Sequence, residues 1–263
     1  MMLITSASNE HIKDIKKLIK SSKERHEKGI FVVEGIRMFK EIPVDRLVDI
    51  YVSETGLEKY GKDISAYSIE PNIVSDKVFN SLSDTNTPQG ILALVKMQKY
   101  TLQDICENKS GKTPFLLIME RLQDPGNMGT IIRTSEGAGV TGIIISSDSV
   151  DIYNPKTIRS TMGSVFRMPI YVSSDLKNDI TVVKDSDITI YAAHLNGNDF
   201  YTNSYCQGVG FLIGNEGNGL SEEISSTADK LIRIPMCGKV ESLNAATSAA
   251  IISYEVLRQR IKK

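Results

Sequence analysis

Apolar residues near the N-terminus recur at the spacing of one helix face. The residues concerned are Ile12, Ile15, Leu18 and Ile19. Asn9, just before them, is a residue type that commonly caps a helix start. The pattern therefore predicts an amphipathic helix over residues 10–21.

Beyond residue 114 the pattern changes to short apolar runs separated by stretches of helical character. The runs are residues 115–119, 142–145, 188–193, 209–213 and 231–234. Such alternation is typical of an α/β domain with a mostly parallel sheet. Ligands of such sheets bind beyond the carboxyl ends of the strands, so we expect the site in the loops there.

A polar stretch separates the two patterns. The first part closes with an apolar run at residues 90–95, and residues 108–114 (NKSGKTP) follow as a flexible, proline-terminated segment. We therefore predict two domains, a smaller one at residues 1–107 and a larger one at residues 114–263.

Composition points to a globular protein outside the membrane. The chain has 263 residues, of which 41% are hydrophobic. No apolar stretch approaches the roughly 20 residues that cross a bilayer. The N-terminus also lacks a basic segment followed by a long apolar one, so the simplest expectation is a cytoplasmic location.

Cysteine and histidine spacing argues against structural zinc and a disulfide framework. The residues are Cys106, Cys206, Cys237, His11, His26 and His194. The cysteines are odd in number and far apart, and the histidines are scattered. No metal is expected, and His194, which follows an apolar run, is expected to be a strand-end residue rather than a ligand.

The net charge of −1 gives no general argument for nucleic acid, so an RNA-binding surface must be local. Residues 10–28 carry seven basic and four acidic side chains, a balance of +3. This face is either a solvated surface with pairs such as Asp14 with Lys17, or a patch for RNA phosphates. In the second case Lys13, Lys17 and Arg25 are candidate RNA contacts.

Three glycine-containing segments follow apolar runs and precede possible helices. They are residues 124–133 (DPGNMGTIIR), 212–220 (LIGNEGNGL) and 234–245 (IPMCGKVESLNA). If the runs are strands of one parallel sheet, the segments meet at one edge around a small charged ligand. Residues 137–142 (GAGVTG) match G-x-G-x-x-G, but they follow a helix and precede a strand, the reverse of a dinucleotide loop. We interpret these glycines as a helix end.

Arg133 and Glu216 are the leading candidates for chemistry. Arg133 would share a helix face with Gly129 and Gly137, so that a ligand can approach its guanidinium closely. The alternative is a surface arginine in an ion pair. Glu216 projects from a glycine-rich loop, where the alternative is a solvated carboxylate.

Three further polar residues have either a structural or a functional role. Asn127 follows Asp-Pro-Gly, where asparagine is a natural N-cap. Ser242 and Asn244 precede a helix, so one of them is expected to cap it and the other to face a ligand. That helix, over residues 245–257, is rich in alanine and large apolar residues, and an interface with a second copy is one way to bury it.

The three segments resemble the motifs of the SpoU/TrmH family of RNA ribose 2′-O-methyltransferases, a knotted class of S-adenosylmethionine enzymes. Residues 154–156, 159–163 and 166–169 are also similar to that family, so the resemblance covers roughly residues 114–263. Residues 31–35 (FVVEG) resemble a substrate-binding domain often fused to these enzymes.

The resemblance implies a C-terminal domain with a trefoil-knotted S-adenosylmethionine site, dimerising through that domain, and a smaller N-terminal α/β domain for RNA. The substrate would be structured RNA, ribosomal rather than transfer RNA. The positions matched to donor binding are Leu195, Gly214, Ile234 and Leu243. The positions matched to the polar catalytic residues are Asn127, Arg133, Glu216, Ser242 and Asn244. Lys156 and Arg159 are candidates for the RNA backbone, with solvated surface charge as the alternative.

Family mechanisms sometimes make the arginine a general base, but a guanidinium has a pKa above about 12 and rarely loses its proton. Arg133 is better suited to clamp a phosphate and stabilise an oxyanion, oriented by Glu216 and Asn127, and the base stays open. The rival functions are a non-catalytic RNA- or ribosome-binding factor and a Rossmann-type oxidoreductase. The reversed order around residues 137–142 argues against the second.

Overall fold

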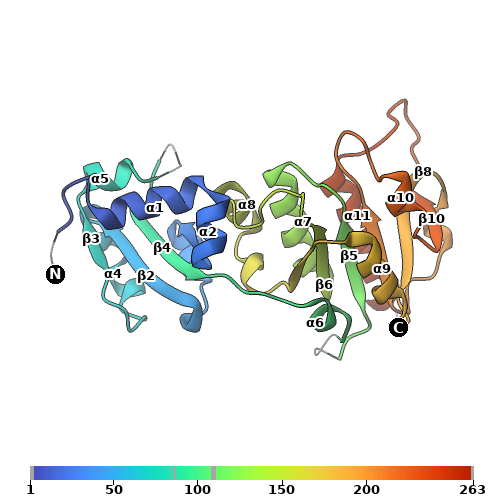
Figure 1. Ribbon diagram of the computed structural model, residues 1–263, viewed down its shortest axis with the longest axis horizontal. Coiled ribbons are helices and arrows are strands. Elements are labelled where there is room, and N and C mark those ends of the chain that lie inside the picture. The colour runs from blue at the N-terminus through green and yellow to red at the C-terminus, as the bar shows by residue number, and fades with distance from the viewer. Residues whose placement is uncertain (1–2, 84, 86, 108–110, 262–263) are drawn as a thin grey trace. The chain divides into compact units, whose positions relative to one another are not determined.

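The computed structural model describes residues 3–83, 85, 87–107 and 111–261 (Figure 1). Residues 108–110, part of the segment predicted to link the domains, lie outside the described residues. The chain divides into two compact units. The N-terminal unit comprises Met1–Gln98 and Asp151–Phe166, and the C-terminal unit comprises Lys99–Val150 and Arg167–Lys263.

The N-terminal unit is built on a four-stranded sheet with the order β1-β4-β2-β3. Its strands are β1 (Ile30–Glu34), β2 (Leu47–Ser53), β3 (Asn72–Val74) and β4 (Ile91–Lys96). Its helices are α1 (Glu10–Lys20), α2 (Ser22–Lys28), α3 (Ile36–Phe39), α4 (Glu54–Ile64), α5 (Asp76–Asn80) and α8 (Pro155–Thr161), with short 3-10 turns at Val44–Arg46 and Ser164–Phe166. Strand β4 runs antiparallel to β1 and β2, whereas β2 and β3 are parallel.

The amphipathic helix predicted near the N-terminus is confirmed as α1. The Asn9 side chain accepts a hydrogen bond from the His11 backbone N–H, which satisfies one donor of the first turn. Ile12, Ile15 and Leu18 are buried in the core above the sheet. The charged face of α1 is left to solvent.

The prediction that Arg25 contacts RNA is corrected by the structure, because the Arg25 side chain is only 3% exposed. Its guanidinium donates to the Asp151 carboxylate at 2.6 and 2.9 Å and to the backbone oxygens of Leu18 and Ile19. Arg25 thereby ties the end of α1 to the segment that begins at Asp151. Its structural role leaves no exposed cation for a phosphate.

The C-terminal unit is built on a six-stranded, fully parallel sheet with the order β10-β8-β9-β5-β6-β7. Its strands are β5 (Phe115–Met119), β6 (Gly142–Ser146), β7 (Ile170–Ser173), β8 (Thr189–Asp199), β9 (Val209–Ile213) and β10 (Lys230–Arg233). Its helices are α6 (Leu102–Glu107), α7 (Pro125–Ala138), α9 (Leu176–Lys184), α10 (Glu222–Ser225) and α11 (Ala245–Ile261), with a 3-10 turn at Phe200–Thr202. The predicted α/β class with a parallel sheet is confirmed.

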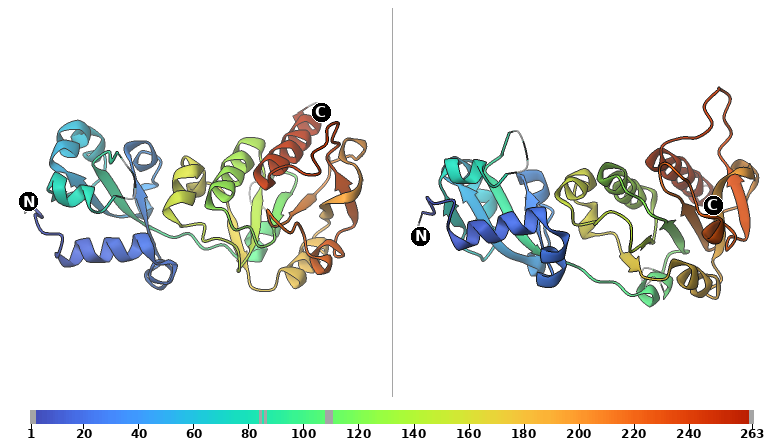
Figure 2. Two further views of the ribbon diagram at one scale, coloured as in Figure 1. Left: turned by 90° about the horizontal axis from the view of Figure 1, so that it is seen from above. Right: turned by 45° about the horizontal axis from the view of Figure 1, so that its top comes forward.

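Helices cover both faces of this sheet. Figure 2 shows α7 and α11 side by side on one face, and the two helices pack against each other. On the other face, residues of α6 and α9 such as Ile105 and Ile180 share a buried cluster with Leu116 and Ile118 of β5. Burial on both sides explains why the central strands read as continuous apolar runs.

The five predicted strands of this unit are present, but β7 was missed and β8 is longer than predicted. Strand β8 continues past the apolar run to Asp199, so His194 lies inside a strand and not at its end.

The predicted glycine helix end is confirmed, because Gly139 ends α7 with φ of 77°. The trefoil knot stays a prediction, because strand order and pairing do not describe how the chain threads. Within the described residues, every helix is too short or too polar to cross a bilayer.

Replacing Asp151 with Asn should destabilise the N-terminal unit. Burial by itself raises the pKa of Asp151, but hydrogen bonds from the Tyr153 N–H and Arg25 outweigh it and lower the pKa below the usual value. Asp151→Asn leaves the buried Arg25 charge uncompensated, so we expect a loss of about 3–5 kcal/mol in the free energy of unfolding at pH 7. Urea denaturation followed by circular dichroism measures it.

The pH dependence gives a second readout. A lowered folded-state pKa contributes stability that is present above the unfolded value of about 3.9 and is lost as pH falls through the folded value. Wild type should therefore lose part of its stability below about pH 4, and Asp151→Asn should lose less. Asp14→Asn, which removes exposed ion pairs with Lys17 and Lys28, is the matched control and should change little. Equal stability of wild type and Asp151→Asn would contradict this assignment.

Candidate functional site

The three glycine-containing segments meet in the C-terminal unit, as predicted. The Asn127 side chain donates to Glu216 Oε1 at 3.1 Å, and the Asn244 side chain donates to Asn127 Oδ1 at 2.9 Å. Asn127 lies in the first turn of α7, Glu216 in the loop after β9, and Asn244 just before α11. We call Asn244, Asn127 and Glu216 the amide–carboxylate chain. It joins loops that are up to 117 residues apart in sequence.

Glu216 is held as a carboxylate by donors from the start of α7. Its Oε1 also accepts the Asp124 N–H at 3.0 Å, and its Oε2 accepts the Gln123 N–H at 3.1 Å. Partial burial by itself raises the pKa of Glu216, but these hydrogen bonds outweigh it and hold the pKa below its usual value. Glu216 is therefore an exposed carboxylate whose two oxygens are fixed by hydrogen bonds to the segment around the start of α7.

The helix caps differ in part from the expectation. Asp124 caps α7, since its Oδ1 accepts the Asn127 N–H at 2.7 Å, so Asn127 is not the N-cap and its side chain is available to the amide–carboxylate chain. Asn244 caps the start of α11 by accepting the N–H groups of Ala246 and Thr247. Of the pair Ser242 and Asn244, Asn244 is thus the cap.

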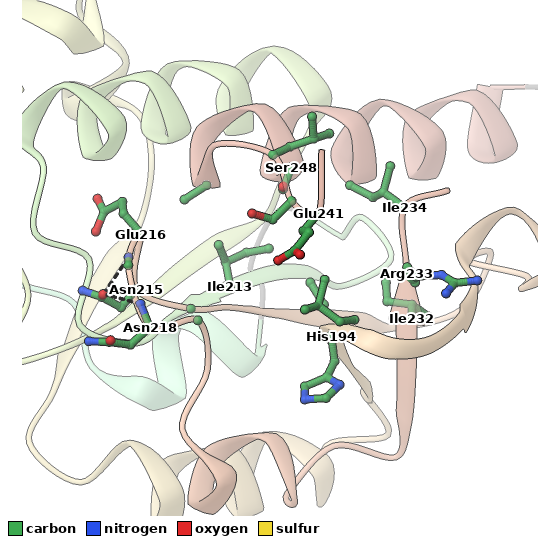
Figure 3. Close-up of a pocket in the computed structure, with 18 of the residues that line it drawn as sticks. His194, Ile213, Asn215, Glu216, Asn218, Ile232, Arg233, Ile234, Glu241 and Ser248 are labelled. Atoms are coloured by element: carbon green, nitrogen blue, oxygen red, sulfur yellow. Dashed lines mark hydrogen bonds between the residues drawn. The ribbon is translucent and has the colours of Figure 1, made fainter. Parts of the chain in front are cut away.

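A cavity of about 380 Å³ opens beside the amide–carboxylate chain (Figure 3). Its walls come from β8, the loop after β9, the end of β10 and the loop before α11. It is lined by all four residues matched to donor binding, Leu195, Gly214, Ile234 and Leu243, and also by Glu216 and Ser242.

The cavity has a mixed lining with two carboxylates. Glu241 reaches into its middle in Figure 3, whereas the Arg233 guanidinium points away from it. Asn215 fixes the loop shape by accepting the N–H groups of Gly217 and Asn218 and donating to the Arg121 backbone oxygen at 2.7 Å. The loop is thereby preorganised, and its backbone lines the opening.

Arg133 does not line this cavity. It is exposed on α7 and makes no hydrogen bond or ion pair within the described part of the chain, so its guanidinium is available to a ligand. The open glycine face expected around it is present only in part. Gly137 is exposed, as expected, but Gly129 is buried, which corrects the prediction at that position.

The remaining candidate RNA contacts lie in the N-terminal unit. Lys13 and Lys17 are exposed on α1, and Lys17 pairs with Asp14 at 3.4 Å. Lys156 is exposed in the first turn of α8, and Arg159 is half-buried one turn later. These four cations belong to the N-terminal unit, whereas the cavity belongs to the C-terminal unit.

Sequence reasoning missed three residues of the site. They are Gln123, Asn215 and Glu241, of which the last two line the cavity. Asn215 and Glu241 stand inside the quoted segments, so their polarity was an available signal. His194, which was expected to be a strand-end residue rather than a ligand, lies in β8 on the wall of the cavity.

Comparisons with known proteins agree along the whole chain. Residues 114–254 match the model of the SpoU rRNA Methylase family, and residues 9–93 match an MRM3-like substrate binding domain. The chain is 30% identical to the 23S rRNA (guanosine(2553)-2′-O)-methyltransferase RlmP of Bacillus subtilis, over 97% of this chain and 99% of that protein. It is 28% identical to the 23S rRNA (uridine(2479)-2′-O)-methyltransferase of Streptomyces viridochromogenes, over 97% and 92% of the two chains.

Solved structures give the same picture. An AdoMet-bound rRNA methyltransferase from Sinorhizobium meliloti superposes with a TM-score of 0.84 at 30% identity, covering 98% of this chain and 97% of that one. The SpoU methyltransferase AviRb from Streptomyces viridochromogenes, in complex with AdoMet, also gives 0.84 at 26% identity, covering 96% and 98%.

Gly214→Ala should disrupt the loop, whereas Gly217→Ala should not. A Cβ on Gly214 would lie 2.1 Å from the carbonyl carbon of Gly219 and 2.2 Å from the nitrogen of Leu220, both backbone atoms. At Gly217 the nearest atom, Asn215 Oδ1, would be 3.6 Å away, an ordinary contact. We expect Gly214→Ala to cost on the order of 2 kcal/mol and Gly217→Ala within about 0.5 kcal/mol, measured by urea denaturation. Equal stability of the two variants would show that the tight turn is absent.

Proposed function

Because the chain belongs to the SpoU rRNA methylase family, we propose that it transfers a methyl group from S-adenosylmethionine to a ribose 2′-hydroxyl of ribosomal RNA. The observation that carries the proposal is the amide–carboxylate chain beside the cavity. The N-terminal unit, including Asp151–Phe166, would bind the RNA, and the C-terminal unit would carry the transfer. A ribosomal substrate fits a cytoplasmic location.

The residues of the cavity fit the methyl donor. S-adenosylmethionine consists of a nucleoside covalently joined to an amino acid. A pocket for such a ligand needs apolar walls with a few polar groups, and Leu195, Ile213 and Leu243 provide the apolar walls. Gly214 exposes backbone where a side chain would obstruct, and Glu241 and Glu216 supply negative charge for a cationic ligand. When bound, S-adenosylmethionine supplies an electrophilic methyl group on a positively charged sulfur.

The residues that line the cavity and those of the amide–carboxylate chain have separate roles in the proposed reaction. Leu195, Gly214, Ile234 and Leu243 hold the donor and exclude water from it. The Asn244–Asn127 pair fixes the loop before α11, Glu216 orients Asn127, and Ser242 faces the ligand from the cavity wall. With three donors already on its carboxylate, Glu216 is poorly suited to accept a further proton.

Arg133 is assigned to the RNA. Its permanently charged guanidinium can clamp a phosphate and stabilise negative charge that develops on the 2′-oxygen. Because Arg133 does not line the cavity of its own chain, a homodimer formed through the C-terminal unit is part of the proposal. Tyr254, 53% exposed on α11 next to α7, supports such an interface.

The RNA backbone is assigned to cations of the N-terminal unit. Lys13 and Lys17 present their ammonium groups on the exposed face of α1, and Lys156 and Arg159 lie on α8. Phosphate contacts of this kind supply affinity that falls with salt but carry no sequence information.

S-adenosylhomocysteine should raise the melting temperature of the protein, and NAD should not. A ligand that binds only the native state at about 100 times its Kd stabilises it by about 2.7 kcal/mol. A thermal shift assay with both ligands measures this. A shift with NAD alone would overturn the methyltransferase proposal, and rRNA binding without any S-adenosylhomocysteine shift would favour a non-catalytic RNA-binding factor.

Arg133→Ala should abolish transfer but leave donor binding intact. Loss of a preorganised cationic donor costs roughly 10²–10³ in rate, so labelled-methyl transfer to 23S rRNA should fall by at least about 100-fold. Arg133 is exposed and contacts no described side chain through a hydrogen bond or ion pair, so the S-adenosylhomocysteine shift should be unchanged. Arg133→Lys, which keeps the charge but not the planar fork, should retain part of the activity. Normal turnover by Arg133→Ala would refute the assignment.

A further inference from the structure

A second cavity, of about 280 Å³, lies wholly within the N-terminal unit. It opens beyond the carboxyl ends of β2 and β3, between the first turns of α4 and α5 and the residues that lead into β4. This is the edge of the sheet where ligands of α/β domains commonly bind. We call it the N-terminal pocket.

The floor of the N-terminal pocket is rigid backbone. The Ser53 N–H donates to the Gly90 backbone oxygen at 2.9 Å, which ties the end of β2 to the start of β4. Gly90 has a φ of +82°, and a Cβ on Gly56 would lie 2.2 Å from the Gly90 oxygen. Only glycine permits this approach of α4 to the strand, so the pocket keeps its shape without a ligand.

The acid in the pocket is already satisfied. Asp76 Oδ1 accepts the Thr55 hydroxyl at 2.7 Å and the Thr55 N–H at 3.3 Å. The hydrogen bond from the Thr55 hydroxyl is the largest cause that holds the pKa of Asp76 below its usual value. With this fixed carboxylate and a single lysine, Lys59, the pocket is unsuited to an isolated phosphate. No group of three or more metal-ligating side chains occurs in the described residues, so a metal site is not indicated either.

Other polar side chains of the pocket have hydrogen-bonding groups left for a ligand. Lys59, Tyr60 and Asn80 make no hydrogen bond within the part of the chain that the structure describes. Gln89 Oε1 accepts the Ile36 N–H at 2.9 Å, which fixes this side chain and leaves its amide donors for a ligand. The pocket thus offers an aromatic ring, two carboxamides and one ammonium group around a hydrated space.

We infer that the N-terminal pocket binds one unpaired nucleoside of the RNA substrate, with its base against Tyr60 and its polar edge at Asn80 and Gln89. Proteins recognise RNA mainly through splayed-out bases that stack on aromatic rings and use their hydrogen-bonding edges. A volume near the lower end of ligand pockets admits one nucleoside rather than two. The inference rests on the proposed function and adds to it a contact away from the methylated ribose.

Direct RNA binding tests the inference in the full-length protein. The probe is an unmodified 23S rRNA transcript, and the readout is its Kd by filter binding at fixed salt. Loss of one stacked base weakens binding by about tenfold, so Tyr60→Leu should raise Kd by about that factor. Tyr60→Phe keeps the ring and should stay near wild type. Asn80→Ala should also weaken binding.

A charge-matched control lies on the same helix. Lys59→Ala should raise Kd more than Lys62→Ala, because Lys62 is exposed on α4 but does not line the pocket. The S-adenosylhomocysteine shift should be unchanged in every variant. Unchanged Kd values for Tyr60→Leu and Asn80→Ala, or an equal loss for Tyr60→Phe, would overturn the inference. Failure of the proposed function is distinguishable, because wild type would then bind the transcript without methylating it.

Discussion

The hydrogen-bonded chain from Asn244 through Asn127 to Glu216 is the interaction on which the site depends. Each asparagine uses both ends of its carboxamide, since Asn244 caps α11 while donating to Asn127, and Asn127 accepts this bond while donating to Glu216. A hydrogen bond to a charged group such as Glu216 contributes at most about 1.5–3 kcal/mol, and one between neutral amides such as Asn244 and Asn127 about 0.5–1.5 kcal/mol. Together these bonds favour one arrangement of the three loops before any ligand binds. Such preorganisation is what a transfer reaction requires of its site.

Much of the C-terminal fold and the meeting of its loops could be predicted from the sequence. Central strands buried on both faces read as apolar runs, and glycines mark the loops where backbone must approach a ligand or another loop. Parallel strands then force these loops to one edge, which is why residues as distant as Asn127 and Asn244 were expected together. The amphipathic α1 with its Asn9 cap follows from local rules alone.

The errors arose where tertiary contacts decide the outcome. Arg25 has the sequence context of a surface cation, but its partner Asp151 lies 126 residues away. The edge strand β7 has only four residues, Ile170–Ser173, and so short a run does not stand out as a strand in the sequence. Gly129 was read as part of an open surface with Arg133 and Gly137, whereas it is buried. Local periodicity contains no information on any of these contacts.

Determining the crystal structure of the protein with S-adenosylhomocysteine tests the central claim most directly. The account predicts density in the 380 Å³ cavity, in contact with Leu195, Gly214, Ile234 and Leu243, with the Asn244–Asn127–Glu216 hydrogen bonds preserved. Density for the ligand at another place, or a complex in which these three residues have separated, would contradict it.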